Sequence, residues 1–361
     1  LFRILNQSPL PRKMRMTRSF LVESETEVEG GILLGTTTEK PVIDFGGFRF
    51  TLSTIKSMLE APLKSVYRWV PDEPADLVPT LSYTERARSA CRYPKVKPRI
   101  LIPVFAGTNC ELDAKHAWER CGSEVTMLLI NTMDANHIAR SVSSCKEALN
   151  NSQILFIPGG FSAADEPDGS GKFIAAFFRH PHLKQAISDL LVKQDGLIGG
   201  ICNGFQALLQ LGLLLHNEVG DMQEDDPVLT INQLGRHISR LVNCRVSSIL
   251  SPWMGAYNVG DTVLLPISHG EGRFCAPERT MERLVQSGQI ASQYVDEQMR
   301  AAGYGKDNPN GSLYAVEALT SSDGKVFGRM AHSERLIDKS YLNTEAKADC
   351  GLFWGAIRYF Q

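Results

Sequence analysis

The stretch Gly196-Leu-Ile-Gly-Gly-Ile-Cys-Asn-Gly-Phe-Gln206, which continues into a leucine-rich run, decides the fold. A short apolar run ends at Ile201, and after Gly204 the apolar residues recur at the spacing of one helix face. This pattern predicts a strand, a sharp turn and a helix, with Cys202 on the turn. The frame Gly200-x-Cys202-x-Gly204 therefore resembles the nucleophile elbow, with cysteine in place of serine.

A cysteine at the tip of such a turn is suited to nucleophilic attack. Its side chain points away from the sheet, and the helix that follows directs its positive end at the sulfur, which favours the thiolate. The backbone N–H of Asn203 is placed to donate to an oxyanion. Because free cysteines are commonly small core residues, the motif needs partners before it indicates catalysis.

A histidine and a glutamate near the end of the chain could complete a triad. The segment 325–331 is predicted to be a strand, and His332-Ser333-Glu334-Arg335 follows it directly. In an extended segment, residues two apart face the same way, so Glu334 could orient the imidazole of His332 toward Cys202. Upstream, the apolar strand 153–157 ends in a Gly-Gly-Phe turn, whose Gly160 and Phe161 N–H groups could join Asn203 in an oxyanion hole.

Five separated motifs in this order resemble the glutaminase domain of phosphoribosylformylglycinamidine synthase, a class I (triad) glutamine amidotransferase. The resemblance covers roughly residues 98–361. Many family members are expected to have proline at the position of Ser333, a departure that leaves the triad positions untouched. The motifs are Pro-Gly-Gly-Phe-Ser (158–162), Gly-Ile-Cys-Asn-Gly-Phe-Gln (200–206), Pro-Ile-Ser-His-Gly-Glu-Gly-Arg-Phe (266–274), Asn-Pro-Asn-Gly-Ser (308–312) and Ala-His-Ser-Glu-Arg (331–335).

The resemblance implies that Cys202, His332 and Glu334 hydrolyse L-glutamine to glutamate and ammonia, and that Gln206 helps to hold the substrate. The ammonia would feed a synthetase domain or subunit, where ATP and Mg²⁺ support conversion of formylglycinamide ribonucleotide to formylglycinamidine ribonucleotide in purine biosynthesis. This chain contains no G-x-x-x-x-G-K-[ST] loop. We therefore expect no cofactor in the chain itself.

Alternating strand and helix patterns predict an open, doubly wound, mostly parallel α/β sheet flanked by helices, over residues 98–361. Residues 235–330 are richer in strand patterns and are expected to supply the rest of the sheet and an added β layer. The predicted strands of the first half are 99–105, 124–130, 153–157 and 196–201, and the helices between them are 114–121, 134–149 and 173–193.

The first hundred residues differ from the rest. Residues 1–70 have short β patterns and a helical pattern over 52–63, with Thr51 or Ser53 available as its cap. This piece is too short to bury a core alone. It resembles the end of the synthetase portion that precedes the glutaminase in the long form of the enzyme. Residues 71–97 are proline-rich and predict a linker. Residue 1 is leucine, which suggests processing or a longer chain, and the sequence does not decide between a fragment and a subunit.

Composition excludes several classes of function. The hydrophobic content of 43% and the charged content of 22% are ordinary for a globular protein. A net charge of −2 gives no positive electrostatic field that would attract nucleic acid or an anionic membrane. The eight cysteines form no C-x-x-C pair, as expected for reduced thiols in a cytoplasmic protein. We predict no metal site, because the acidic loop 165–168 is better explained as a solvated or substrate-facing loop.

Alternatives remain at the site. Cys110 competes as nucleophile but lacks the glycine frame, and His269 competes as base but lacks a carboxylate two residues on. We expect His269 and Arg273 to be structural or interdomain residues near the site. A cysteine hydrolase or peptidase of the same fold, or a non-catalytic regulatory domain, would be the other classes of function. A complete set of Cys202, His332 and Glu334 argues against the non-catalytic class.

Overall fold

The computed structural model describes most of the chain and divides it into two compact units, residues 1–69 and 70–361. The described residues are 2–3, 24, 26–27, 29, 33, 35–45, 47–61, 76–87, 90–162, 171–336, 341, 344 and 346–361. The acidic loop 165–168 and the predicted end of a helix at Leu63 lie outside them.

Within the described residues, the first unit consists of a small sheet and one helix. Thr51 caps that helix as predicted, since its Oγ1 accepts a hydrogen bond from the Thr54 N–H at 3.1 Å. Phe48, Met58 and Leu59 are exposed, in line with a unit too small to bury its apolar side chains. Its elements are β1 (Phe2–Arg3), β2 (Thr36–Thr37), β3 (Val42–Phe45), β4 (Phe48–Thr51) and α1 (Leu52–Glu60), with the strands in the order β2-β1-β3-β4.

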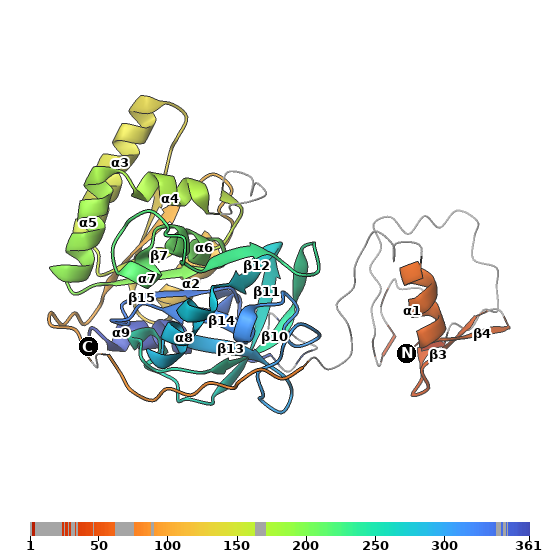
Figure 1. Ribbon diagram of the computed structural model, residues 1–361. Helices are drawn as coiled ribbons and strands as arrows, with labels where there is room; N and C mark the ends of the chain where they lie inside the picture. The colour runs from red at the N-terminus through yellow and green to blue at the C-terminus, as the bar shows by residue number, and fades with distance from the viewer. Residues whose placement is uncertain are drawn as a thin grey trace. The chain divides into compact units, whose positions relative to one another are not determined.

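The second unit is built on a nine-stranded sheet in the order β11-β10-β13-β14-β15-β8-β7-β5-β6 (Figure 1). Its parallel half comprises β5 (Arg99–Val104), β6 (Glu124–Leu129), β7 (Ile154–Ile157), β8 (Leu197–Ile201) and β15 (Val326–Arg329). Its antiparallel half comprises β10 (Ile238–Val246), β11 (Thr262–His269), β13 (Ile290–Val295) and β14 (Val316–Thr320). The predicted fold class is confirmed. Most of the predicted added layer continues this sheet, and β9 (Val228–Ile231) pairs with β12 (Glu271–Cys275) in a separate one.

Helices cover both faces of the sheet. The single helix predicted over 173–193 is two helices, because Pro181 cannot continue the preceding one and instead begins the next. The helix predicted after Cys202 also breaks, at Gly212. The helices of this unit are α2 (Glu111–Arg120), α3 (Ala135–Asn150), α4 (Lys172–Phe178), α5 (Pro181–Val192), α6 (Asn203–Gln210), α7 (Leu213–His216), α8 (Glu278–Gln286) and α9 (Gly351–Arg358).

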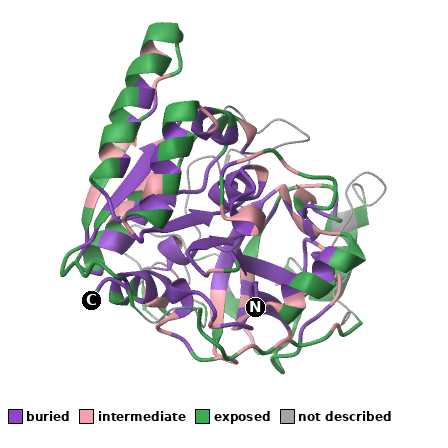
Figure 2. Ribbon diagram, turned by 60° about the vertical axis from the view of Figure 1, so that its left-hand side comes forward, coloured by how far each residue is buried: buried purple, intermediate pink, exposed green. Residues whose placement is uncertain are grey.

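The core lies on either side of β7, β8 and β15, which are buried at every residue, whereas the edge strand β6 is largely exposed (Figure 2). On one face, Trp118 of α2 packs edge-on against Phe353 of α9 and Trp253, with ring centroids 4.9 and 5.8 Å away. On the other face, Phe205 of α6 lies against β15 at Gly328. The strand β8 is thus held between an aromatic cluster and the helix that follows it.

The close approach of α6 to β7 explains the glycine after the elbow. A Cβ on Gly204 would lie 2.0 Å from the carbonyl oxygen of Ile157, which is backbone and cannot move aside. We expect Gly204→Ala to lower the free energy of unfolding by roughly 1–3 kcal/mol in urea titrations. Gly220→Ala is the control, because a Cβ there meets nothing within 4 Å. Equal stability of the two variants would contradict this account of the elbow.

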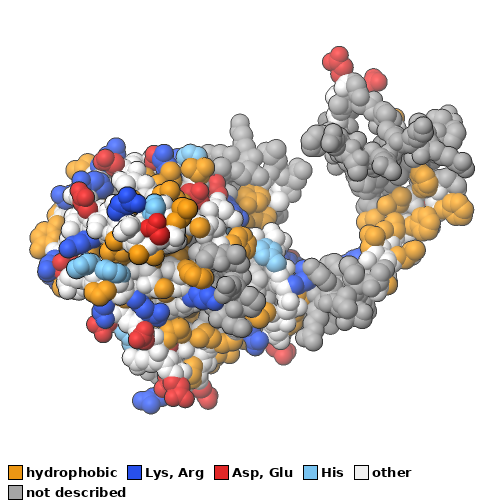
Figure 3. Space-filling view, turned by 90° about the horizontal axis from the view of Figure 1, so that it is seen from above, with side chains coloured by type: hydrophobic (Ala, Val, Ile, Leu, Met, Phe, Trp, Pro, Cys, Tyr) orange, Lys and Arg blue, Asp and Glu red, His pale blue; other side chains and the backbone are white. Residues whose placement is uncertain are grey.

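The proline-rich segment predicted as a linker lies along the second unit. The Val78 N–H donates to the Ala301 carbonyl at 3.0 Å, and the Tyr83 N–H donates to the Ser247 carbonyl at 2.8 Å. Across the described residues, none of the helices combines the length and apolarity of a membrane span. Basic and acidic side chains are interspersed on the face shown in Figure 3.

Candidate active site

Cys202 occupies the turn between β8 and α6 in a strained backbone conformation. Its φ is 51° and its ψ is −107°, a combination that non-glycine residues rarely adopt. Two backbone hydrogen bonds hold this conformation. The Cys202 N–H donates to the Arg329 carbonyl of β15 at 2.8 Å, and the Cys202 carbonyl accepts from the Gln206 N–H at 3.0 Å. The sulfur lies 3.8 Å from the Ser268 carbonyl at the end of β11. This is the geometry predicted for a nucleophile elbow.

His332 and Glu334 form a buried pair beside Cys202. They follow β15, the parallel neighbour of β8, so the sheet itself brings them to the elbow. The Nδ1 of His332 lies 2.6 Å from Oε1 of Glu334, and both side chains are buried. The segment is not extended as predicted, because Glu334 lies in a short 3₁₀ turn over Ser333–Arg335. The turn still brings the carboxylate back to the imidazole.

Three side chains of the site meet around Gly159, at the end of β7. A Cβ on Gly159 would lie 2.8 Å from Cε1 of His332, 3.1 Å from Sγ of Cys110 and 3.4 Å from Cβ of Cys202. Glycine is therefore required there for the imidazole and the two cysteines to share one space. Cys202, His332 and Glu334 thus lie in one site, in the order that a nucleophile, a base and an orienting carboxylate would take.

The electrostatics of the pair favour a charged imidazole. Burial alone would lower the pKa of His332, but the Glu334 carboxylate and the neighbouring thiols of Cys110 and Cys202 outweigh it. The pKa of His332 is consequently raised well above its ordinary value. With Glu334 at Nδ1, the other ring nitrogen of His332, Nε2, is buried and has no hydrogen-bond partner among the described residues.

Cys110 is a second cysteine in this site. It lies at the start of α2, and its sulfur is 3.9 Å from Nδ1 of His332, which Glu334 already occupies. The sulfur also contacts Asn109 Oδ1 at 3.1 Å and accepts a hydrogen bond from Arg335 at 3.0 Å. Burial raises the pKa of the Cys110 thiol. Cys110 is therefore poorly placed as nucleophile compared with Cys202.

The oxyanion-hole prediction needs one correction. The Phe161 N–H, predicted as a donor, donates instead to the Gly107 carbonyl at 2.8 Å. The Ser162 N–H donates to Oδ1 of Asn203 at 3.3 Å, which ties this loop to the start of α6. Gly160 and Asn203 are left as candidate donors, since Asn203 is the first residue of α6 and its N–H has no intrahelical acceptor.

Two of the three remaining predicted residues, Gln206 and His269, lie near the elbow. The Gln206 side chain accepts from Asn203 Nδ2 at 3.1 Å and donates to the Glu271 carbonyl at 2.7 Å. His269 is buried with its Nδ1 3.1 Å from Asn232 Oδ1, and burial together with the charge of His332 lowers the pKa of His269 to about 3. Arg273 is partly buried on β12, two residues after Glu271. Among the described residues, His269 thus has no carboxylate partner, in contrast to His332.

One cluster in this site has the side chains of a metal ligand set. Ligand atoms of Cys110, His332 and Glu334 lie within 4.8 Å of one another. The positive guanidinium of Arg335, 3.0 Å from the sulfur, opposes a cation there. The absence of a metal remains a prediction.

Sequence reasoning placed Cys110 in the site only as a rival nucleophile, and it did not single out Arg335, Lys172 or the Glu271 side chain. Cys110 follows the carboxyl end of β5, and the ends of parallel strands meet at one edge of the sheet. This position after β5 is the feature of the sequence that indicates Cys110 lies near the site. Lys172 and Glu271 carry no comparable signal, because their proximity to Gln206 arises only from the packing of α4 and β12 around α6.

A doubly wound sheet with a cysteine elbow on one strand and a His-Glu pair after its parallel neighbour defines the class of triad glutamine amidotransferases. The model of the CobB/CobQ-like glutamine amidotransferase domain matches residues 97–360. The chain belongs to this family, and within it to the glutaminases of phosphoribosylformylglycinamidine synthase.

Relatives with that role cover most of the second unit. The phosphoribosylformylglycinamidine synthase subunit PurQ of Methanococcus maripaludis is 32% identical over 242 residues, 67% of this chain and 83% of that protein. PurQ of Prochlorococcus marinus is 33% identical over 248 residues, 68% of this chain and 95% of that protein. A chain in the structure of PurLQS from Thermotoga maritima shares the fold, with a TM-score of 0.54 and 24% identity, covering 73% of this chain and all of that chain.

Proposed function

We propose that this chain hydrolyses L-glutamine to glutamate and ammonia with Cys202 as nucleophile, His332 as base and acid, and Glu334 as the group that orients His332. The observation that carries the proposal is the strained elbow of Cys202 beside a buried His332–Glu334 pair with a 2.6 Å contact. A strained backbone lowers the stability of a protein, and such strain is concentrated at functional sites. A carboxylate that fixes the tautomer of an imidazole is the arrangement found in catalytic triads.

The reaction proceeds in two halves. The Cys202 thiolate attacks the side-chain amide carbon, and the N–H groups of Gly160 and Asn203 stabilise the oxyanion that forms. The imidazolium of His332 then protonates the departing nitrogen, which leaves as ammonia and creates a thioester. Water, deprotonated by His332, attacks the thioester carbon and releases glutamate, and the proton returns the site to its starting state.

The ammonia is proposed to pass to a synthetase partner. There ATP and Mg²⁺ would activate formylglycinamide ribonucleotide, which ammonia converts to formylglycinamidine ribonucleotide. The names of the PurQ relatives and of the PurLQS assembly support this assignment. The eight cysteines are all free, as suits a protein of the reducing cytoplasm. Residues 1–70 are proposed to be the end of the synthetase portion that precedes the glutaminase.

Glutamate release is the test of this function. The purified chain is assayed with L-glutamine, alone and with a synthetase partner, ATP and formylglycinamide ribonucleotide. We expect slow release by the chain alone and faster release with the partner and its substrates. Cleavage of peptide substrates without any use of glutamine would favour the hydrolase alternative, and no turnover under any condition would favour a non-catalytic domain.

A further inference from the structure

Cys110 is a buried thiol of the site that the proposed mechanism does not use, and it stands in a cluster with two residues that the mechanism does use. Its sulfur lies 3.9 Å from Nδ1 of His332, and that nitrogen lies 2.6 Å from Oε1 of Glu334. Ligand atoms of all three residues lie within 4.8 Å of one another. A thiolate, an imidazole nitrogen and a carboxylate oxygen are ligands that Zn²⁺ favours. The cluster therefore has the donor atoms of a site for a soft divalent cation.

The carboxylate of Glu334 has one oxygen to spare. Its Oε1 faces His332, whereas its Oε2 is buried and has no hydrogen-bond partner among the described residues. A buried oxygen without a partner is unfavourable, because it has lost its hydration and gained nothing in exchange. Since this oxygen lies beside a thiol and an imidazole, a cation bound between them would satisfy it.

A positive charge already lies at the edge of the cluster. The Arg335 guanidinium donates to the Cys110 sulfur at 3.0 Å. Burial lowers the pKa of Arg335, but the charges of Cys110 and Glu334 outweigh burial and raise it. Its remaining contact, with Asp113 of α2 at 3.7 Å, is partly exposed. Because like charges repel strongly where water is excluded, the guanidinium disfavours a second cation at this point. Arg335 thus stands where a metal ion would otherwise be bound.

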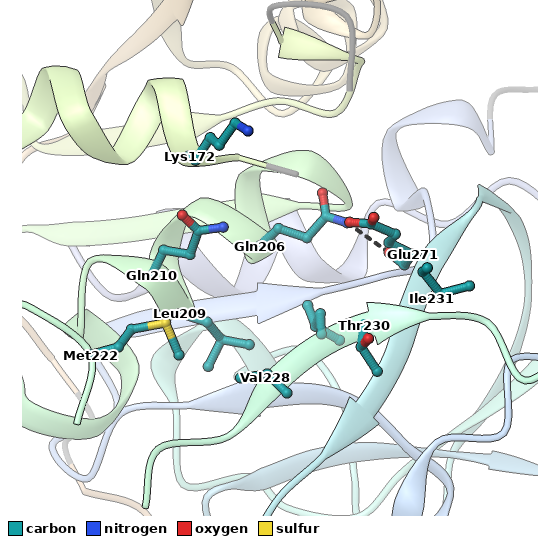
Figure 4. Close-up of a pocket in the computed structure, with 10 residues that line it drawn as sticks. Lys172, Gln206, Leu209, Gln210, Met222, Val228, Thr230, Ile231 and Glu271 are labelled. Atoms are coloured by element: carbon teal, nitrogen blue, oxygen red, sulfur yellow. Dashed lines mark hydrogen bonds between the residues drawn. The ribbon is translucent and has the colours of Figure 1, made fainter. Parts of the chain in front are cut away.

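A metal ion in this cluster would stop the triad. Ligands bind a metal in their deprotonated form, so the ion would displace the thiol proton of Cys110 and the Nδ1 proton of His332. The metal, and no longer Glu334, would then set the orientation of His332. The pocket of about 410 Å³ that opens beside α6 shares none of its lining residues with the cluster (Figure 4). The ion would therefore act on the triad and leave that pocket open.

We propose that Arg335 excludes soft divalent cations, of which Zn²⁺ is the representative, from a latent metal site formed by Cys110, His332 and Glu334. The role of Arg335 is protective: it keeps the imidazole and the carboxylate available to each other when zinc is present. This exclusion is a property of metal binding, and it holds whether or not the chain hydrolyses glutamine.

Isothermal titration calorimetry of the purified chain with Zn²⁺ tests the proposal, because it gives the number of sites and their affinities without an activity assay. Arg335→Met removes the charge, and Arg335→Lys retains it. Arg335→Met combined with Cys110→Ala also removes one ligand. Arg358→Met is the matched control, because it removes an exposed arginine from α9. Thermal unfolding establishes that each variant is folded.

We expect Arg335→Met to gain one Zn²⁺ site, with an affinity at least roughly 100-fold above any that the wild type shows there. Arg335→Lys and Arg358→Met should bind Zn²⁺ as the wild type does. Adding Cys110→Ala to Arg335→Met should abolish the gained site. In assays of glutamate release by the chain alone, micromolar Zn²⁺ should lower the kcat of Arg335→Met but not of the wild type, and EDTA should restore it.

Equal Zn²⁺ binding by the wild type and folded Arg335→Met would overturn the proposal, whether both bind the ion or neither does. A gained site that persists without the Cys110 thiol would place the ion elsewhere and overturn it as well. These calorimetric results can be read in a chain that does not use glutamine, so they distinguish failure of this inference from failure of the proposed function. If Arg335→Met does not fold, Arg335→Gln replaces it in every arm.

Discussion

Replacing Cys202 with alanine should lower glutamate release from glutamine by roughly 10⁴-fold or more. The sulfur forms the covalent bond to the substrate, and no other group at the tip of the elbow can replace it. The side chain is buried and small, and alanine suits the same site, so the variant should fold. Steady-state glutamate release in the presence of the synthetase partner measures the loss, and the urea unfolding midpoint tests folding.

Cys110→Ala is the matched control for this result. Cys110 lies in the same space as His332 and is also buried, but Arg335 and Asn109 already engage its sulfur. We expect this variant to keep most of the activity. Losses of equal size in Cys110→Ala and Cys202→Ala would contradict the assignment of the nucleophile.

Glu334→Gln should have the second largest effect, a loss of roughly 10² to 10⁴-fold in kcat, because an amide neither orients nor charges the imidazole as a carboxylate does. It should also change the pH profile. Burial lowers the pKa of His332, and the charge of Glu334 makes the largest contribution that raises it. Removing that charge therefore lowers the pKa. The imidazolium that protonates ammonia is lost as pH rises through the His332 pKa. The high-pH limb of the kcat profile should therefore move to lower pH.

The measurement is kcat for glutamine across the pH range, for the wild type and Glu334→Gln. Glu317→Gln is unsuitable as a control, because Glu317 pairs with Arg329 at 2.7 Å inside the core. The exposed Glu278→Gln of α8 serves instead. A high-pH limb that stays in place, or moves to higher pH, would show that Glu334 does not raise the pKa of His332.

The sequence predicted those parts of the molecule that local pattern determines. The strands of the parallel half and the elbow at Cys202 carry unbroken apolar runs and a glycine frame, and each lies within a residue or two of its prediction. The strand β13 was missed because it carries Ser292 and Gln293, whose burial depends on distant partners. Gln293 donates to the Tyr314 carbonyl at 2.8 Å, a contact that no local pattern reveals.

The site shows the same limit. The pairing of His332 with Glu334 was anticipated from their spacing, although a 3₁₀ turn and not an extended segment produces it. The Phe161 N–H donates a hydrogen bond to the carbonyl of Gly107, which lies 54 residues away in the sequence. Lys172 and Glu271 lie beside Gln206 only through tertiary packing. Sequence thus locates side chains within a motif better than it locates the residues that packing brings next to them.

The central claim, that Cys202 is the nucleophile toward glutamine, is tested most directly by covalent labelling with 6-diazo-5-oxo-L-norleucine, a glutamine analogue with an electrophilic carbon. Peptide mass spectrometry locates the adduct after reaction in the presence and absence of excess L-glutamine. We predict one adduct, on Cys202, which glutamine suppresses and which His332→Ala slows. An adduct on Cys110, or labelling of Cys202 that excess glutamine does not suppress, would contradict the account.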